Sequence, residues 1–523
     1  MIAWRFMIVA VFAGLAIAGC DSAVPEPRPL EKRAGPYLEA PVPVGSDIAD
    51  YYKNRGFRPF WMTRSGVKPE AFQLVAMIED AANDGLDPGL FSVAEVKAAL
   101  QAAASGDAKA RARAELLLSR AYVRFARDLR EPRHPDAMSY VDSGLAPVRA
   151  SSADLLDELS NSRDLPGHLA TLQQVNPLYA RLRRGVAAYR KRWSALPRIT
   201  LPLSPDLRPG DTDERVDLLR RRLGLPEGRA FDGALAKAVR TFKAVHALPP
   251  DFVADAATIH ALNLGASHYE RLIAANLERA RRIPADPGKR FILVDAAGAR
   301  LWLFEHGRAV DTMRTIVGKP GMETPEMAGL IRFAVLNPYW NVPPDLIRHN
   351  VAKRAVREGV GTIRRQRLQV LTDWTPRARI LNPASVNWAA VASGREIVRV
   401  RQLPGAGNAM GGVKFMLPNR LGIYLHDTPD KSSFGRPDRR LSSGCVRVED
   451  ARRLSRWLFR GAGVTNSGAA EQRVDLPEPV PVYLTYLTVV PGPGGIIFQK
   501  DVYGRDRALS AAVKEQDPVR TGV

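Results

Sequence analysis

Hydrophobic positions change their spacing along this chain, and the change separates a helical part from a strand-rich part. Between residues 46 and 200 apolar residues recur at helical intervals, as in Phe72, Val75, Ile78 and Ala82. That spacing places them on one face of a helix. From Lys289 onward the interval becomes two, which predicts antiparallel strands at 291–295, 300–305 and 309–317. The pattern therefore predicts an α+β chain with several domains.

A compact helical stretch lies between these two parts, at residues 205–265. It begins with a Pro-Gly-Asp turn and continues with three short apolar helical segments, separated by turns that contain Phe231-Asp232 and Leu248-Pro249. A connecting helix is expected from Tyr269 to Arg282. After the β-rich part, which we place at residues 289–505, the polar tail at 506–523 is expected to be disordered.

The N-terminal segment has the features of a targeting sequence. Its apolar run from Phe6 to Ala18 follows a single positive residue, Arg5, and is too short to span a bilayer comfortably. Residues 1–20 therefore suit a signal peptide that ends Ile17-Ala18-Gly19-Cys20. Residues 21–45 are rich in proline and charge, which predicts an extended tether that cannot bury a core.

The length and net charge of the chain limit the number of domains and the kinds of partner to expect. A chain of 523 residues is too long for one ordinary domain. The formal net charge of +21 implies anionic surroundings, such as lipid headgroups, nucleic acid or a carboxylate-rich cell wall. The arginines are scattered and form no run of five, which favours a solvated basic surface over a nucleic-acid site.

Candidate chemistry concentrates between Leu421 and Val448. A short strand, expected at 421–425, leads into His426, and a polar loop then returns the chain to Ser443-Gly444-Cys445 and Arg447. A thiol beside an imidazole is the minimum arrangement for nucleophilic catalysis by cysteine. Gly444 permits close backbone approach, so the N–H groups of Gly444 and Cys445 are candidate oxyanion donors. The Arg447 guanidinium fits a carboxylate.

This stretch resembles the catalytic signature of the L,D-transpeptidases, the YkuD-type enzymes that cross-link bacterial peptidoglycan. The resemblance rests on His426-Asp-Thr-Pro429 and on Ser442-Ser-Gly-Cys-Val-Arg447, a form similar to that of the large members with a scaffold domain. Ser443 stands where other members have a second histidine. The resemblance implies a helical scaffold domain at 46–200 and a catalytic domain whose partly helical cap occupies about 344–402. Residues 205–265 resemble a three-helix peptidoglycan-binding module, with wall-binding and purely structural roles equally open.

The resemblance also implies roles for individual residues. Cys445 would be the nucleophile and His426 its base, with Gly444 in the oxyanion site. Arg447, Tyr424 and Ser443 would contact the substrate, a peptidoglycan stem peptide. The product would be a 3→3 cross-link formed through a thioester. Two alternatives remain open: an L,D-carboxypeptidase or related hydrolase on the same fold, and a non-catalytic wall-binding scaffold. A backbone carbonyl is expected to orient His426.

No cofactor or metal is expected, because the sequence has no His-Glu-x-x-His, no paired Cys-x-x-Cys and no glycine-rich phosphate loop. The end of the N-terminal segment resembles a bacterial lipobox, which implies lipidation of Cys20. Asp21 resembles the signal that retains lipoproteins in the inner membrane. The expected location is therefore the periplasmic face of that membrane. Protein partners cannot be named from the sequence.

Overall fold

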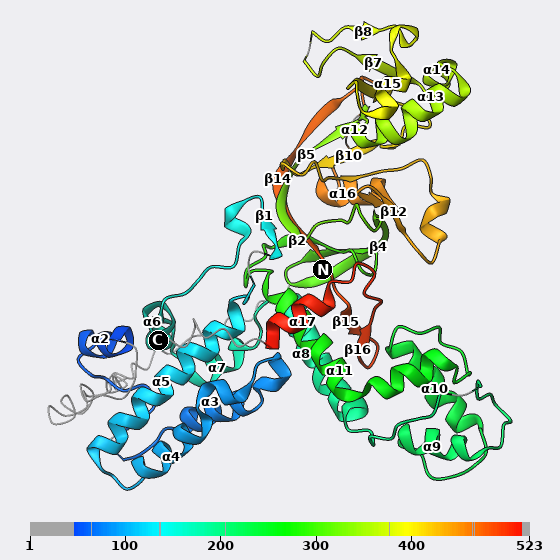
Figure 1. Cartoon of the computed structure of the whole chain (residues 1–523). Coiled ribbons are helices and arrows are strands. Elements are labelled where there is room, and N and C mark those ends of the chain that lie inside the picture. The colour runs from blue at the N-terminus through cyan, green and yellow to red at the C-terminus, as the bar shows by residue number, and fades with distance from the viewer. Residues whose placement is uncertain are drawn as a thin grey trace, which may run out of the picture.

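The computed structural model describes residues 46–63, 65–134, 137–203, 205–375, 377–462, 464 and 466–514. The predictions for the signal peptide, Cys20 and the proline-rich tether lie outside these residues. The chain has a helical N-terminal region and a β-rich C-terminal domain, so the α+β multidomain prediction is confirmed. In Figure 1 the helical region and a smaller helical module lie on opposite sides below the central sheet, and a cap lies beyond the sheet's other end.

The helical region packs around one long helix, α5 (Ala108–Arg130). Asp107 begins this helix by accepting a hydrogen bond from the Ala110 N–H. The expected apolar stripe near residue 75 is only partly correct, because Phe72 is 56% exposed and Ala82 is exposed, whereas Val75 and Ile78 are buried. The other helices are α2 (Ser46–Asn54), α3 (Pro69–Glu79), α4 (Val93–Ala103), α6 (Ser152–Asn161), α7 (Leu165–Leu172) and α8 (Pro177–Tyr189).

The small module has a hydrophobic core of its own. It contains α9 (Glu214–Arg222), α10 (Gly233–Val245) and the first part of α11 (Ala256–Arg281). Lys243 is fully buried in it, and its Nζ contacts Asp251, the Val253 carbonyl and Asp255. This lysine therefore holds the turn before α11. Helix α11 kinks at Gly265, and its second half packs on the helical region, where the Arg281 guanidinium donates to the Leu129 carbonyl.

The central sheet joins ten described strands, in the order β1-β5-β10-β11-β13-β4-β3-β2-β14 with β12 on β4. Strand β14 also pairs with β5, so the sheet closes on itself. The strands are β1 (Ser139–Tyr140), β2 (Arg290–Asp295), β3 (Arg300–Glu305), β4 (Arg308–Gly318), β5 (Met327–Leu336), β10 (Val413–Met416), β11 (Leu425–His426), β12 (Arg440–Ser442), β13 (Val446–Val448) and β14 (Gln472–Thr485). Strand β1 belongs to the helical region, which therefore contributes an edge to this sheet. Helix α16 (Ala451–Leu458) follows β13.

The cap has a separate four-stranded sheet, in the order β6-β9-β7-β8, and a separate core. It leaves the central sheet after β5 and returns to it at β10. Its elements are β6 (Trp340–Asn341), α12 (Pro344–Leu346), a π-helical turn (Ile347–Ala352), α13 (Lys353–Glu358), α14 (Gly361–Arg365), β7 (Leu368–Leu371), β8 (Ile380–Leu381), α15 (Trp388–Ser393) and β9 (Arg399–Gln402). The cap residues are inserted between β5 and β10, two strands that pair in the central sheet. This insertion places the cap next to β10 and β11.

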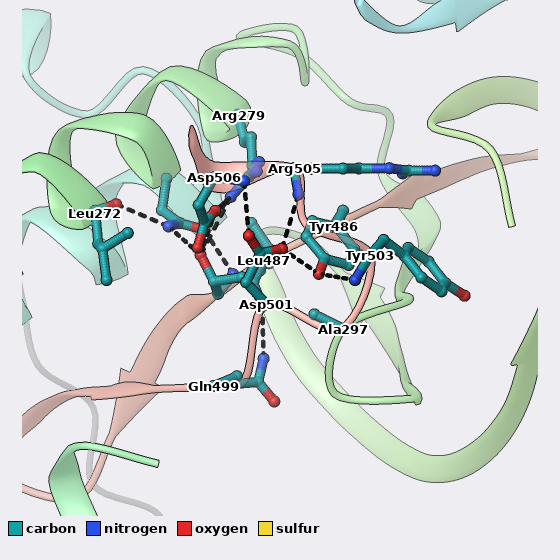
Figure 2. Close-up of polar contacts among 12 residues, drawn as sticks. Leu272, Arg279, Ala297, Tyr486, Leu487, Gln499, Asp501, Tyr503, Arg505 and Asp506 are labelled. Atoms are coloured by element: carbon teal, nitrogen blue, oxygen red, sulfur yellow. Dashed lines mark hydrogen bonds and ion pairs between the residues drawn. The ribbon is translucent and has the colours of Figure 1, made fainter. Parts of the chain in front are cut away.

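The predicted disorder of the tail is wrong for its first part, because α17 (Asp506–Lys514) is a helix that packs on α11. Asp506 is buried and accepts hydrogen bonds from Arg279 Nη1 at 2.6 Å and from Thr488 Oγ1 at 2.9 Å. Figure 2 shows this network between α11, α17 and the hairpin of β15 (Val489–Gly492) and β16 (Gly495–Phe498). The sequence composition of the tail did not reveal its partner, Arg279, which lies 227 residues earlier. Among the described residues, no helix is long and apolar enough to cross a membrane.

Candidate active site

Two short parallel strands, β11 and β13, bring the candidate residues together. Leu425 pairs with Val446, and His426 pairs with Arg447. Leu425 and Val446 point into the core of the sheet. Because side chains alternate along a strand, His426 and Arg447 lie on the opposite face. Tyr424 and Cys445, two residues before them, lie on that same face. The sheet therefore collects the motif on one face.

The expected strand at 421–425 is wrong in its length, since β11 contains only Leu425 and His426. Gly422 adopts a positive φ of 66°, which ends extended backbone there. The Asn419 side chain holds the resulting turn, donating to the Leu417 and Ile423 carbonyls and accepting from the Ile423 N–H. This turn places the Gly422 carbonyl 3.5 Å from Cys445 Sγ.

The loop that carries Cys445 is held by a buried threonine. Gly444 has a φ of 110°, a conformation that favours glycine, and its carbonyl accepts from Thr324 Oγ1 at 2.8 Å. The same hydroxyl accepts from the Gly318 N–H at the end of β4, at 2.9 Å. Thr324 is fully buried. One hydroxyl therefore connects the cysteine loop to β4.

The oxyanion donors differ in part from the prediction. The Gly444 N–H donates to Ser442 Oγ at 3.2 Å, and this hydroxyl in turn donates to the Cys445 carbonyl at 2.6 Å. The Gly444 N–H is thus engaged inside the turn. Within the described residues the Cys445 N–H has no hydrogen-bond partner. The N–H of Cys445 is the donor that this turn leaves open to a substrate.

His426 has a defined tautomer. Its Nδ1 lies 2.6 Å from the Asp427 carbonyl, and because a carbonyl only accepts, Nδ1 carries the hydrogen. The Asp427 peptide is itself fixed, since its N–H donates to the Val413 carbonyl at 2.9 Å. Burial, together with the positive charge of Arg447, lowers the pKa of His426 to about 3. His426 is therefore a neutral imidazole with the lone pair on Nε2, oriented by a backbone carbonyl as expected.

Cys445 and Arg447 both lack strong partners. Burial raises the pKa of the Cys445 thiol, and hydrogen bonds from Tyr424 and the charge of Arg447 offset only part of this effect. Burial also lowers the pKa of Arg447, and the nearby Asp430 opposes this. Arg447 forms no ion pair with any described residue, and its buried Nε has no hydrogen-bond partner there. A half-buried guanidinium left open in this way suits an incoming carboxylate.

Tyr424 and Ser443, the other two residues predicted to contact the substrate, have different surroundings. The Tyr424 ring lies edge-on to His426 with centroids 5.6 Å apart, and its hydroxyl donates to Met410 Sδ at 3.3 Å. Burial raises the pKa of Tyr424, and so does the neighbouring Cys445. Ser443 is exposed beside the nucleophile. Tyr424 therefore lines the face of the motif, whereas Ser443 lies at its rim.

Sequence reasoning missed three residues that hold this arrangement: Thr324, Ser442 and Met410. Ser442 is the first serine of the motif, whereas Thr324 and Met410 belong to no motif that the sequence analysis quotes. Thr324 and Met410 contact residues that lie 120 and 14 positions away, so no local signal identifies their partners. Ser442 contacts Gly444 and Cys445 within its own turn, and only the folded turn shows which N–H group it takes. No three His, Cys, Asp or Glu side chains in the described parts of the chain are grouped to hold a metal ion.

Comparison with known proteins agrees with the motif. Residues 289–474 match the YkuD family, the L,D-transpeptidase catalytic domain, and residues 46–185 match the scaffold domain family. A putative L,D-transpeptidase of Haemophilus influenzae is 32% identical over 261 residues, which are 49% of this chain and 52% of that protein. The chain thus matches about half the length of this curated relative.

Two solved structures with a detectable likeness are described as L,D-transpeptidases. One, from Mycobacterium smegmatis, is 12% identical, with 38% of this chain and 58% of that chain covered and a TM-score of 0.20. Another, from Xylanimonas cellulosilytica, is 17% identical, with 54% and 98% covered and a TM-score of 0.18. On the family matches and the curated relative, residues 289–474 are an L,D-transpeptidase catalytic domain of the YkuD family, preceded by a scaffold domain.

Proposed function

We propose that the protein forms 3→3 cross-links in peptidoglycan through a thioester on Cys445. One observation carries the proposal: a thiol, a neutral imidazole and a guanidinium share one face of β11 and β13, and among the described residues the imidazole Nε2 has no hydrogen bond and the guanidinium no ion pair. A wall-binding scaffold has no use for such a set. The donor is a tetrapeptide stem, and the acceptor is the side-chain amine of a second stem.

The first half of the reaction acylates the enzyme. His426 Nε2 takes the thiol proton, and Cys445 Sγ attacks the carbonyl carbon that precedes the terminal D-alanine. The oxyanion that forms accepts a hydrogen bond from the Cys445 N–H. The C–N bond then breaks, D-alanine leaves with the proton held by His426, and a thioester remains.

The second half transfers the acyl group. The amine of the second stem gives a proton to His426 and attacks the thioester carbon. The new C–N bond forms as the C–S bond breaks, and His426 returns its proton to the departing sulfur. If water replaces the amine, the same steps give a tripeptide, which is the carboxypeptidase alternative.

Arg447 links substrate binding to the strength of His426 as a base. Its charge is one cause of the low pKa of His426. A substrate carboxylate that pairs with Arg447 would offset that charge, so the pKa of His426 would rise when the donor binds. The imidazole would then become a stronger base only in the loaded site. A free enzyme with a protonated thiol and a weak base would be protected from wasteful reaction.

Product analysis tests this proposal and separates its alternatives. Purified protein is incubated with tetrapeptide-containing muropeptides, and products are identified by liquid chromatography and mass spectrometry. Cross-linked dimers with loss of D-alanine support transfer, and tripeptides without dimers support hydrolysis. Unchanged substrate with wild-type protein, under conditions where the peptide binds, would refute both enzymatic assignments.

The location is part of the proposal. Lipidation of Cys20 would anchor the chain to the periplasmic face of the inner membrane, with the proline-rich residues 21–45 as a tether. Two or more acyl chains give the stable anchoring that one does not. Cys20→Ser should abolish metabolic palmitate labelling. A wild-type protein that takes up no label would refute the anchor without affecting the catalytic proposal.

A further inference from the structure

The scaffold domain contains a cavity of about 540 Å³ beside α5. Ligand sites in proteins commonly enclose between about 300 and 1,000 Å³. Its apolar surface comes from Ile48, Leu90 and Phe91, and its polar surface comes mainly from α5. Helix α5 and β12, the strand that precedes Cys445, lie in different parts of the molecule (Figure 1). The cavity is therefore distinct from the face that carries Cys445.

One face of α5 supplies both signs of charge to this cavity. Arg120, Arg124, Arg127 and Asp128 line it from α5, and so does Glu131, the residue directly after the helix. Their spacing of three and four residues places them on the same side of the helix. Arg149 enters from the segment before α6. Such a surface matches a ligand that carries carboxylates and an amine together.

Existing contacts occupy only part of this set. Arg120 pairs with Glu95 at 3.4 Å, and the Arg127 guanidinium donates to Ser152 Oγ at 3.1 Å. Arg124 Nε lies 3.9 Å from Asp128 Oδ2, at the outer limit of an ion pair. Glu131 is 6% exposed, yet its carboxylate has no hydrogen bond or ion pair with any described residue. Its carboxylate oxygens are not among the fully buried side-chain atoms of the described structure, so they keep access to the cavity and can pair with a cation there. Arg149 is exposed and also has no ion pair in the described structure.

We propose that this cavity is a second, non-catalytic site for a peptidoglycan stem peptide. The free amine of the peptide would pair with Glu131, and its carboxylates with Arg124 and Arg149, while its methyl groups lie on the apolar surface. The choice of ligand rests on the proposed function, because a stem peptide is a short chain with several carboxylates and one free amine. A site of this kind would hold the polymeric wall while Cys445 acts on a neighbouring stem.

The test is calorimetric titration of the full chain carrying Cys445→Ala with a soluble stem tetrapeptide. Two binding sites are expected. Adding Glu131→Gln, which keeps the shape of the side chain, should weaken one of them at least tenfold, and Arg149→Gln should do the same. The matched controls are Glu214→Gln, in the small module, and Arg113→Gln, which lies on α5 and pairs with Glu95 instead. Both controls should bind as the parent does.

A second measurement separates binding from catalysis. In the protein with Cys445 intact, Glu131→Gln should raise KM for polymeric peptidoglycan severalfold and leave kcat and the turnover of a soluble tetrapeptide unchanged. A single binding site that is unaffected by both cavity variants overturns the inference. A single site that Glu131→Gln abolishes supports the cavity and counts against peptide binding at Arg447. Failure of the inference and failure of the proposed function are thus distinguishable.

Discussion

Thr324 offers a sharp test of how the cysteine loop is positioned. Its buried hydroxyl accepts from the Gly318 N–H and donates to the Gly444 carbonyl. Thr324→Val keeps the shape of the side chain and leaves both backbone groups unpaired. At about 1–3 kcal/mol for each buried group without a partner, the local free energy of opening should fall by roughly 2–6 kcal/mol. Thr324→Ser keeps the hydroxyl and loses one methyl, which costs only about 0.8 kcal/mol.

Two assays report this difference. Hydrogen exchange followed by mass spectrometry, in the peptide containing Gly318, should be at least ~30-fold faster in Thr324→Val than in wild type, since 1.4 kcal/mol is about tenfold. Acylation of Cys445 by a tetrapeptide donor, followed as release of D-alanine, should slow by up to ~100-fold, because small misplacements of reacting groups are costly. If the Val and Ser variants exchange and acylate at equal rates, the hydroxyl does not position the loop.

Substitutions at three further residues test the chemistry and the pH dependence. Cys445→Ala and Cys445→Ser should abolish dimer formation while thermal unfolding stays close to wild type, and turnover by either variant would remove Cys445 from the mechanism. Arg447→Lys should reduce kcat/KM by a factor equivalent to about 1.5–3 kcal/mol, because one ammonium cannot replace a bidentate pair; wild-type kinetics would contradict carboxylate binding. Burial raises the pKa of Asp295 to about 6, so its stabilising contribution is complete below its unfolded pKa and is lost as pH rises through 6. Relative to Asp295→Asn, wild type should therefore lose about 2.4 kcal/mol between pH 4 and pH 7, seen as a falling difference in Tm; a difference that rises would refute the sign.

Part of the site follows from sequence alone because its signals are local. The period of two predicts the strands around residues 291–317, and the structure has β2, β3 and β4 there. The sequence order of His426, Cys445 and Arg447 indicates cysteine chemistry, because each side chain has a distinctive reactivity. The register of the paired strands then brings these residues together, because side chains alternate along each strand and these residues lie on one face. The resemblance to a known family was contained in the same few residues.

The remaining features depend on which groups meet once the chain has folded. The sequence suggested the Gly444 N–H as an oxyanion donor, but this group donates to Ser442 Oγ, so the Cys445 N–H is the donor that remains. The tail looked too polar to order, but Arg279 supplies a buried partner for Asp506. Phe72 fitted an apolar stripe, but no element in the described part of the chain covers it. Sequence periodicity determines which residues can share a face, whereas hydrogen-bond partners and burial are decided only when separate elements pack, because both depend on distances that the chain order does not contain.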